Sequence, residues 1–483
     1  RPRLRRVRRV RFTVVNHSCL HIETAAGSIL VGPWLSGSAY WRSWWHYPPS
    51  PPTRPEWLAP DYVYWTHHHF DHLHYPSARR LAKDTRVLIP RFGVDKMAGE
   101  VRGLGFADVR ELDHGAVVDL GHGVQVASYQ YGFDDTAFVV SDGTDVIVNL
   151  NDCKIRGRSL RRIVEQFGRP TFAFKSYSFA QCYPLAYTAD DPADLEIVHP
   201  AANVDDFIGR MRELAPKYAV PFGSMVAFLH PECFDFNEHL VSPFVAKAAA
   251  DAAGVGGAEV VVMGPGDSWD PDTGFTIDAT DWYTERATQL RALQASVQDT
   301  LDAQAATESG VRVEWDRFRD YFTQFVEALP LGVGRLACKR PIVFRVDSSE
   351  LPYWVVDVAR RRVFRAAVLP PDYADLIHVP EFVLADAIDK ALVHFIHISM
   401  RIRVELAPGG AGSDLGFWGL VGIWELGYFD RRTRHRRRFA EVAWRRRDEG
   451  IGALSALRHR GSLSERMAAQ FAEADSAAVS SRS

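Results

Sequence analysis

The sequence predicts a layered α/β domain followed by an α+β domain, and three observations favour this fold class. Short apolar runs alternate with stretches of helical periodicity from residue 13 to about residue 270. Separate groups of helix-forming and strand-forming segments follow, and 47% hydrophobic with 24% charged residues is ordinary globular composition. We therefore expect a solvated basic arm at 1–12, a first domain at 13–270, a second domain at 271–465 and a disordered tail at 466–483.

The first domain is expected to consist mostly of strands. FTVVN, LHIET and SILVG (12–32) are typical of strands with a turn at 25–27, and a loop rich in Trp, Tyr and Pro follows at 34–55. DYVYWT (61–66) predicts a buried strand, and 76–83 a helix with proline at its start. VLIP, VQVASYQ, TAFVVSD and DVIVNLND predict further strands, with a hairpin turn at Asp142-Gly143. VPFGSMVAFLHP and EVVVMGPGD are typical of strand endings.

The second domain is expected to mix helices with a small sheet. Residues 284–307 contain neither Gly nor Pro and predict one long helix, with a second helix at 315–328. IVFRVD, YWVVDV and RVFRAAV (342–368) predict a three-stranded meander, and 381–399 has helical periodicity. We interpret the arginine clusters at 431–438 and 445–447 as a solvated helix face rather than a phosphate site.

Charge, cysteine content and hydropathy exclude several classes of function. The net charge of −3 does not indicate a nucleic-acid-binding protein, and no apolar run is long enough to span a bilayer. The basic start is followed by strand-like alternation and not by the apolar stretch of a signal peptide. The five cysteines are scattered without a CxxC pair, which is typical of reduced thiols. We expect a cytoplasmic protein that acts on a small molecule.

The most informative segment is THHHFDH (66–72), which directly follows a predicted buried strand. In an extended chain residues two apart point to one side, so His67, His69 and Asp71 can converge, and His72 joins them from the next turn. Imidazole and carboxylate are suitable ligands for zinc, iron or manganese. This spacing favours a metal site over an incidental histidine-rich loop. Two histidines are interpreted as bystanders: His68 and His74.

The order and spacing of six segments resemble those of the CMP-N-acetylneuraminate hydroxylase family. They are NHSCLHIE, GPWL, the Trp-rich loop, WTHHHFDHLHYPSARRLA, FDDTAFVVSDGTDVIVNLNDC and VPFGSMVAFLHP, and they cover roughly residues 13–270. They correspond to the part of the family outside its Rieske domain. The resemblance implies the metallo-β-lactamase fold, a four-layer αββα sandwich with its metal site on loops at one edge.

The resemblance also implies six metal ligands: His67, His69, Asp71, His72, Asp152 and His230. Asp152 occupies the position of the carboxylate that commonly bridges two metals, and His230 matches the last histidine of the pattern. Two positions depart from the family. Tyr131 stands where a histidine is expected shortly before the D-T pair of FDDT. Gly32 replaces the aspartate of D-P-W, which supports the site from behind the ligands.

The remaining ligands favour iron. One metal position keeps two imidazoles and a carboxylate with open coordination sites, as in non-haem iron oxygenases; it comprises Asp71, His72 and His230, with Asp152 adjacent. The other position keeps His67 and His69. The catalytic candidates are Asp71 and Tyr131, whose phenolate either ligates a ferric ion or simply packs. We expect one or two iron ions, with zinc or manganese as alternatives.

The electron source is not in this sequence. A Rieske cluster needs C-x-H and a later C-x-x-H. The chain has Cys19-Leu20-His21 but no C-x-x-H, and Cys19 lies in a predicted strand, so we interpret it as a buried thiol. Electrons then come from a separate protein, or the chemistry differs from hydroxylation.

The candidate substrate contacts come from three segments, and each has packing as its alternative: His17, Trp34, Lys175, Tyr177, Gln181 and Tyr183. The family implies a nucleotide-activated amino sugar; we expect a small molecule, a sugar nucleotide or an amine. We interpret His394 and His397, spaced i, i+3 on a predicted helix, as structural.

Two functions compete. The first is an iron-dependent oxygenase or hydroxylase that lacks its own Rieske cluster, which the surviving ligands and the resemblance favour. The second is a metal-dependent hydrolase of an ester, lactone or phosphodiester, in which a metal lowers the pKa of a bound water. A binding protein with a decayed site is disfavoured because six of the seven usual ligand types remain.

Overall fold

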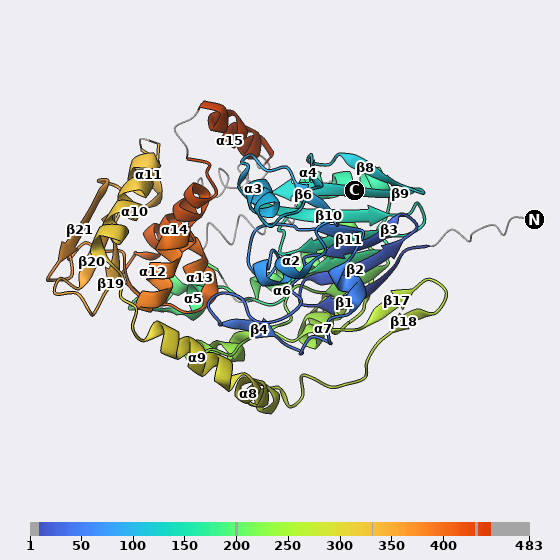
Figure 1. The fold of residues 1–483 in the computed structure, drawn as a ribbon, viewed down its shortest axis with the longest axis horizontal. Coiled ribbons are helices and arrows are strands. Elements are labelled where there is room, and N and C mark those ends of the chain that lie inside the picture. The colour runs from blue at the N-terminus through green and yellow to red at the C-terminus, as the bar shows by residue number, and fades with distance from the viewer. Residues whose placement is uncertain (1–8, 199–200, 331, 430–432, 446–483) are drawn as a thin grey trace, which may run out of the picture.

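Two β-sheets pack face to face in the first domain (Figure 1). The computed structural model describes residues 9–198, 201–330, 332–429 and 433–445. The core between the sheets takes apolar side chains from both of them. Tyr64 stacks on Phe138 with ring centroids 3.7 Å apart, and Phe12 meets Phe174 edge-on at 5.3 Å. Because both faces of the central strands are buried, these strands appear in the sequence as nearly continuous apolar runs.

The first sheet has eight strands. It is antiparallel from β18 to β3 and parallel from β3 to β7. In spatial order the strands are β18 (Gly274–Thr276), β17 (Ser268–Asp270), β1 (Arg11–Asn16), β2 (Cys19–Thr24), β3 (Gly27–Val31), β5 (Tyr62–Tyr64), β6 (Arg86–Pro90) and β7 (Val109–Leu112).

The second sheet has seven strands, and the predicted hairpin at Asp142-Gly143 joins β10 to β11 within it. In spatial order the strands are β16 (Glu259–Val260), β14 (Tyr218–Pro221), β12 (Phe172–Lys175), β11 (Val146–Asn151), β10 (Asp135–Ser141), β9 (Val124–Tyr131) and β8 (Val117–Gly121).

Helices cover the outer face of each sheet. Those on the first sheet are α1 (Pro55–Leu58), α2 (Tyr75–Arg80) and α3 (Lys96–Gly103). Those on the second sheet are α4 (Gly157–Phe167), α6 (Ala202–Leu214) and α7 (Pro243–Ala253). The order of layers is helix, sheet, sheet, helix, so the predicted αββα sandwich is confirmed.

The C-terminal part is built on a six-stranded sheet. Its strands are, in spatial order, β13 (Tyr187–Ala189), β23 (Arg403–Leu406), β22 (Asp375–His378), β19 (Ile342–Arg345), β20 (Tyr353–Asp357) and β21 (Arg362–Ala366). Its helices are α10 (Trp315–Ala328), α11 (Val333–Ala337), α12 (Glu381–Lys390), η3 (Val393–Phe395), α13 (Ile396–Ser399), α14 (Ala411–Glu425) and α15 (Thr433–Arg445). The predicted meander and the helix at 315–328 are confirmed.

Two predicted helices are interrupted. The segment 284–307 forms α8 (Arg286–Ser296) and α9 (Gln298–Glu308), separated at Val297, whose side chain packs beside Leu229 and Leu290. The segment 381–399 breaks after α12 because Ala391 adopts φ +52°. This second break turns the chain so that His394 meets the carboxylate of Glu425.

Elements from the two sides of the predicted domain boundary at residue 270 pair and pack together. β13, from within 13–270, pairs in parallel with β23 of the C-terminal sheet. β4 (Trp44–His46) and β15 (Val226–Phe228) form a separate ribbon whose aromatic side chains pack into the C-terminal core. The remaining short elements are α5 (Cys182–Leu185), η1 (Pro192–Leu195) and η2 (Phe234–His239). The two parts therefore share one core, and this core borders the predicted site.

The ends of the chain are described in part. Arg9 pairs with Asp145 at 2.6 Å, and Arg11 begins β1 and pairs with Glu23 at 2.7 Å, so residues 9–12 belong to the sandwich and not to a solvated arm. Residues 1–8, the tail at 466–483 and most of the second arginine cluster lie outside the described residues. All five cysteines are buried and free. Among the described helices none is long and apolar enough to cross a bilayer.

Candidate metal centre

The histidine-rich segment forms a tight turn where β5 ends. The amides of His72 and Leu73 donate to the carbonyl of His69 at 3.0 and 2.7 Å. Thr136 of β10 donates its hydroxyl to the carbonyl of Thr66 at 2.8 Å, which ties the turn to the opposite sheet. The segment therefore sits at the rim of the sandwich, between the ends of β5 and β10. His74, expected to be a bystander, caps α2 by accepting from Ser77.

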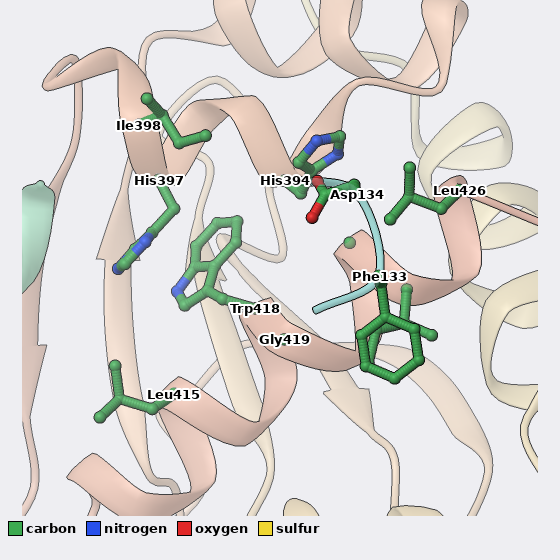
Figure 2. Close-up of a pocket in the computed structure, with 11 residues that line it drawn as sticks. Phe133, Asp134, His394, His397, Ile398, Leu415, Trp418, Gly419 and Leu426 are labelled. Atoms are coloured by element: carbon green, nitrogen blue, oxygen red, sulfur yellow. The ribbon is translucent and has the colours of Figure 1, made fainter. Parts of the chain in front are cut away.

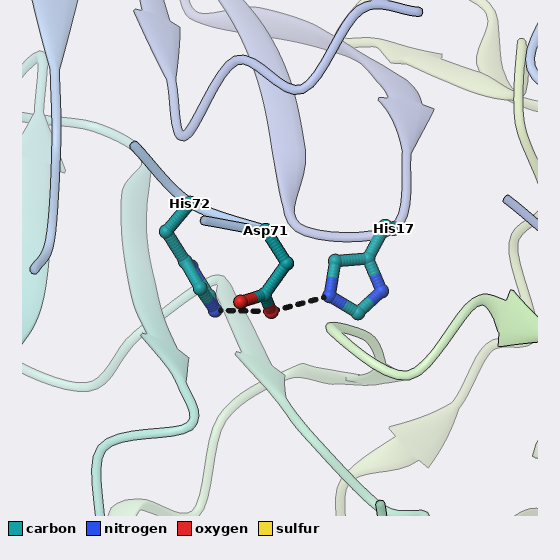
Figure 3. Close-up of side chains that lie close together, drawn as sticks. All are labelled: His17, Asp71 and His72. Atoms are coloured by element: carbon teal, nitrogen blue, oxygen red, sulfur yellow. Dashed lines mark hydrogen bonds and ion pairs between the residues drawn. The ribbon is translucent and has the colours of Figure 1, made fainter. Parts of the chain in front are cut away.

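Two groups of possible metal ligands overlap at this rim. In each group the ligand atoms lie within 4.8 Å of one another: His17, Asp71 and His72 in the first, and His67, His72 and Asp152 in the second. His72 Nε2 lies 3.1 Å from Asp71 Oδ2 and 3.1 Å from Asp152 Oδ2. Figure 3 shows the Asp71 carboxylate between the rings of His72 and His17, whose Nε2 is also 3.1 Å from Oδ2. The structure thus brings four of the six predicted ligands together and adds His17.

The electrostatics of the cluster are those of a site for a cation. Burial alone would lower the pKa of His72, but Asp71 and Asp152 outweigh burial and raise it well above its usual value. Burial likewise works to raise the pKa of Asp71, and the charge of His72 and the hydrogen bond from His17 bring it well below its usual range. An environment that stabilises positive charge on His72 also stabilises a cation bound between these side chains. The residues therefore fit a metal ion.

Three residues of the site were missed by the sequence analysis. Tyr40, from the Trp-rich loop, donates its hydroxyl to Asp71 Oδ1 at 2.5 Å. Asp135 Oδ1 lies 3.5 Å from His67 Nδ1, and Asp134 Oδ2 lies 3.9 Å from His69 Nε2. Burial, then the charges of Asp152 and Asp134, raise the pKa of Asp135 well above its usual value. These two aspartates are the D-D of the FDDT segment (133–136), close to Tyr131, where the resemblance implies a histidine. The acidic pair at that place in the sequence is the signal that could have identified them.

Tyr131 lies at the end of β9, directly across from Asp135 of β10, and its role as a metal ligand stays a prediction. β9 alternates, with Val124 and Val126 facing the core between the sheets. Ala127, Tyr129 and Tyr131 face the outer helical layer. Tyr131 thus packs against the helical layer, while its cross-strand partner Asp135 lies 3.5 Å from His67.

His230 is placed in a different group. It follows β15, which pairs with β4 outside both large sheets, and its ring groups with Glu232 and Glu308. Its Nδ1 accepts from the amide of Glu232 at 3.3 Å. Neither ligand group around His72 includes it, and His69, also outside both groups, lies with its ring centroid 4.4 Å from that of His67.

The predicted substrate contacts divide into two sets. His17 and Gln181 line a cavity of about 80 Å³ together with Asp71 and Asp152. The other four lie in packed surroundings. Lys175 is buried and pairs with Asp206 at 3.2 Å, and Tyr183 donates to the carbonyl of Asp194. Tyr177 is buried beside Tyr283, and Trp34 meets the His17 ring edge-on at 5.7 Å.

Gly32, which stands where the family has aspartate, is required by the local backbone. Its φ is +55°, and a Cβ there would lie 2.9 Å from the carbonyl oxygen of Ser18. Both facts disfavour any other residue at this position. An aspartate at this position is therefore absent, and Asp71 is held by Tyr40 and His17.

No family model matches the chain. It is 31% identical over 245 residues to a protein of Mycobacterium tuberculosis whose name assigns it provisionally to the Rieske 2Fe-2S iron-sulfur proteins; the match covers 47% of this chain and 46% of that one. The chain thus spans about half the length of this relative. It is 37% identical over 79 residues to the cytidine monophosphate-N-acetylneuraminic acid hydroxylase of Pongo pygmaeus, covering 15% of this chain and 13% of that protein. The expected resemblance to this family is therefore confirmed over a short segment.

Solved structures of metallo-β-lactamase-fold proteins are similar to the chain at low identity. One is CmlA, a diiron β-hydroxylase from Streptomyces venezuelae, with 17% identity and a TM-score of 0.36 over 55% of this chain and 54% of that one. Others are Igni18, a metallo hydrolase of Ignicoccus hospitalis (18% identity, TM-score 0.38 over 54% of this chain and 97% of that one), and a protein of Veillonella parvula titled a possible metal-dependent hydrolase (12% identity, TM-score 0.41 over 54% of this chain and 99% of that one). The αββα fold itself is established by the sheets and helices described above.

Proposed function

We propose that the chain is the catalytic part of a metal-dependent oxygenase that uses iron and acts on a small molecule. The observation that carries the proposal is the pair of ligand groups that share His72 and include the carboxylates of Asp71 and Asp152. Imidazole and carboxylate donors without a thiolate are suited to iron or manganese as well as zinc. Iron bound here would supply the redox chemistry that insertion of oxygen requires.

The protein's own groups orient the ligands and hold protons. Tyr40 and His17 bond to the two oxygens of Asp71, so its carboxylate is fixed from both sides. Such partners behind a ligand set its direction and basicity. Nδ1 of His17 is buried and has no hydrogen-bond partner among the described residues, and His17 lines the 80 Å³ cavity. This ring therefore holds Asp71 through Nε2 and forms part of the cavity wall.

The proposed reaction needs an electron donor, and this sequence does not contain the motif of a Rieske cluster. The sequence contains no C-x-x-H, and the Mycobacterium relative extends well beyond the matched region. We propose an iron–sulfur protein or domain as the electron donor.

The test is oxygen uptake by anaerobically iron-loaded protein with ascorbate as reductant. We expect uptake above that of free iron, loss of uptake in His72→Ala, and retention in His239→Ala, an exposed histidine outside the site. Hydrolase activity with zinc or manganese on model esters or phosphodiesters, with no iron-dependent uptake, would establish the alternative function instead.

A further inference from the structure

A second cavity, of about 300 Å³, lies between the turn from β9 to β10 and helix α14 (Figure 2). Its lining comprises six apolar side chains, two glycines, two histidines and one aspartate. Figure 2 shows the carboxylate of Asp134 beside the ring of His394, with Trp418 nearer to His397. The cavity thus joins the first domain, which supplies Asp134, to the C-terminal part, which supplies the aromatic wall.

One glycine of α14, Gly419, lines the cavity and is not required by the packing of the helix. Gly416, Gly419 and Gly422 follow one another every three residues along the helix. A Cβ at Gly416 would lie 2.0 Å from the carbonyl of Ala337, so close packing requires glycine there. A Cβ at Gly419 would meet nothing within 4 Å, and no positive φ requires glycine at this position. A side chain placed at Gly419 would therefore enter the space beside the cavity without disturbing the packing.

The wall of the cavity suits a flat apolar group. The ring of Trp418 is stacked on His397, with centroids 5.1 Å apart, and its indole nitrogen donates to Asp414 at 3.0 Å, so its orientation is fixed. Leu415 and Ile423, from neighbouring turns of α14, extend the apolar surface on both sides. Aromatic walls of this kind bind rings by offset or edge-on stacking.

The charge in the cavity is negative and lies next to the metal centre. Asp134 is the one acidic residue of the lining, which contains no Lys or Arg. Of the described residues, only His68 and His69 approach its carboxylate as ion-pair partners, at 3.8 and 3.9 Å. His69 is the neighbour of the candidate ligand His67, so the charged end of the cavity adjoins the centre.

We propose that this cavity binds a small primary amine with a planar apolar body, with the ammonium on Asp134 and the ring on Trp418. That this amine is the substrate rests on the proposed function; the binding itself does not. An ammonium against a carboxylate forms charge-assisted hydrogen bonds, and the volume is at the small end for ligand sites. A sugar nucleotide is disfavoured because its phosphates would face Asp134 without a cationic partner.

The binding is tested by calorimetry on the metal-free full chain, without oxygen. We expect 2-phenylethylamine to bind at least tenfold more tightly than 3-phenylpropionate, which has the same ring and chain length but the opposite charge. Gly419→Leu should weaken amine binding at least tenfold by filling the space. Gly99→Leu is the matched control: it places the same side chain in an exposed part of α3, where a Cβ also meets nothing within 4 Å. Asp134→Asn should remove the preference for the amine.

Equal binding of amine and acid, or full amine binding by Gly419→Leu, would overturn the proposal. Because iron and oxygen are absent from this assay, its outcome is independent of the oxygenase test. Amine binding without any iron-dependent oxygen uptake would leave the cavity assignment standing and remove the proposed function. Oxygen uptake by a protein that binds no amine would support the proposed function and overturn the cavity assignment.

Discussion

Arg401 is the residue whose removal should destabilise the protein most clearly. Its side chain is fully buried where the two parts of the chain meet, and it forms paired hydrogen bonds with two carboxylates. It donates to both oxygens of Glu308 at 2.6 Å and to both oxygens of Glu232 at 2.8 and 3.1 Å. A further bond reaches the carbonyl of Trp41 at 3.1 Å. Arg401→Met keeps most of the volume and removes every one of these bonds.

The expected loss follows from the burial of the two partners. The side chain of Glu308 is 12% exposed, so without Arg401 it becomes a nearly buried charge that has lost its two strongest hydrogen bonds. It keeps the amide of Gln304 at 2.7 Å and the nearby ring of His230. Glu232 is 42% exposed and water screens it. Removing one member of a buried ion pair costs about 3–5 kcal/mol. We expect Arg401→Met to lower the free energy of unfolding by that amount, mostly through Glu308. Arg401→Met/Glu308→Gln should recover about half of it, since the nearly buried charge is then removed and the charge left on Glu232 is screened by water.

The pH dependence gives the prediction a second readout. Burial alone would raise the pKa of Glu308, and hydrogen bonds from Arg401 outweigh burial and lower it. In the wild type this pair therefore stabilises the fold above the unfolded pKa, about 4.5, and the contribution is lost as pH falls through the lowered value. Without Arg401, burial raises the pKa of Glu308, so stability falls as pH rises. The deficit of Arg401→Met should be larger at pH 7.5 than at pH 4.5.

The assay is urea denaturation followed by tryptophan fluorescence at both pH values. Arg317→Met is the control, because Arg317 forms an exposed pair with Asp389 at 2.6 Å, and such pairs contribute about 1 kcal/mol or less. The reasoning from burial is wrong if Arg401→Met lowers the free energy of unfolding no more than this control does. It is also wrong if the loss of free energy is the same at both pH values.

Three further predictions concern the metal centre and the C-terminal core. His72→Ala should abolish metal binding, measured by elemental analysis after dialysis, because both ligand groups contain this ring; His230→Ala, whose ring lies in neither group, should retain the metal. Tyr40→Phe, which removes the bond to Asp71, should lower metal affinity about 10–100-fold in chelator competition without changing the fold. Burial raises the pKa of Asp414 to about 6, so its neutral form is stabilising below about pH 4 and this contribution is lost as pH rises to about 6. Asp414→Asn should therefore gain stability relative to the wild type as pH rises from 4.5 to 7.5, measured by urea denaturation.

The sandwich and the first metal motif could be predicted because they depend on local pattern. The central strands of the two sheets are apolar runs of strand length, and β5 ends at Tyr64, just before Trp65 and Thr66 lead into the histidine segment. Residues close in sequence, His67 to His72, keep their relative positions in any fold that contains this turn. Asp152 was predicted from the family resemblance, and it reaches the histidines because β11 ends at the same rim.

The positions of Tyr131 and His230 could not be predicted from spacing. A shift of one residue along a strand moves a side chain to the other face, and β9 is buried on both faces, so its pattern does not mark which side meets the metal. His230 depends on which strand β15 pairs with. The partner is β4, within the Trp-rich loop that showed no regular pattern. Tyr40 comes from the same loop, at φ +51°, and its bond to Asp71 follows from tertiary packing alone.

The turn before β10 links the metal centre to the second cavity. Adjacent residues at a strand end point to opposite sides, and here Asp135 lies beside His67 while Asp134 lies beside His69 and lines the cavity. The carboxylates of this turn place oxygen donors beside the histidines of the centre, and such donors suit iron or manganese as well as zinc. The same turn places the negative charge that selects a cationic ligand. Metal preference and ligand charge therefore depend on neighbouring residues of one turn, and a change to its aspartates should alter both properties together.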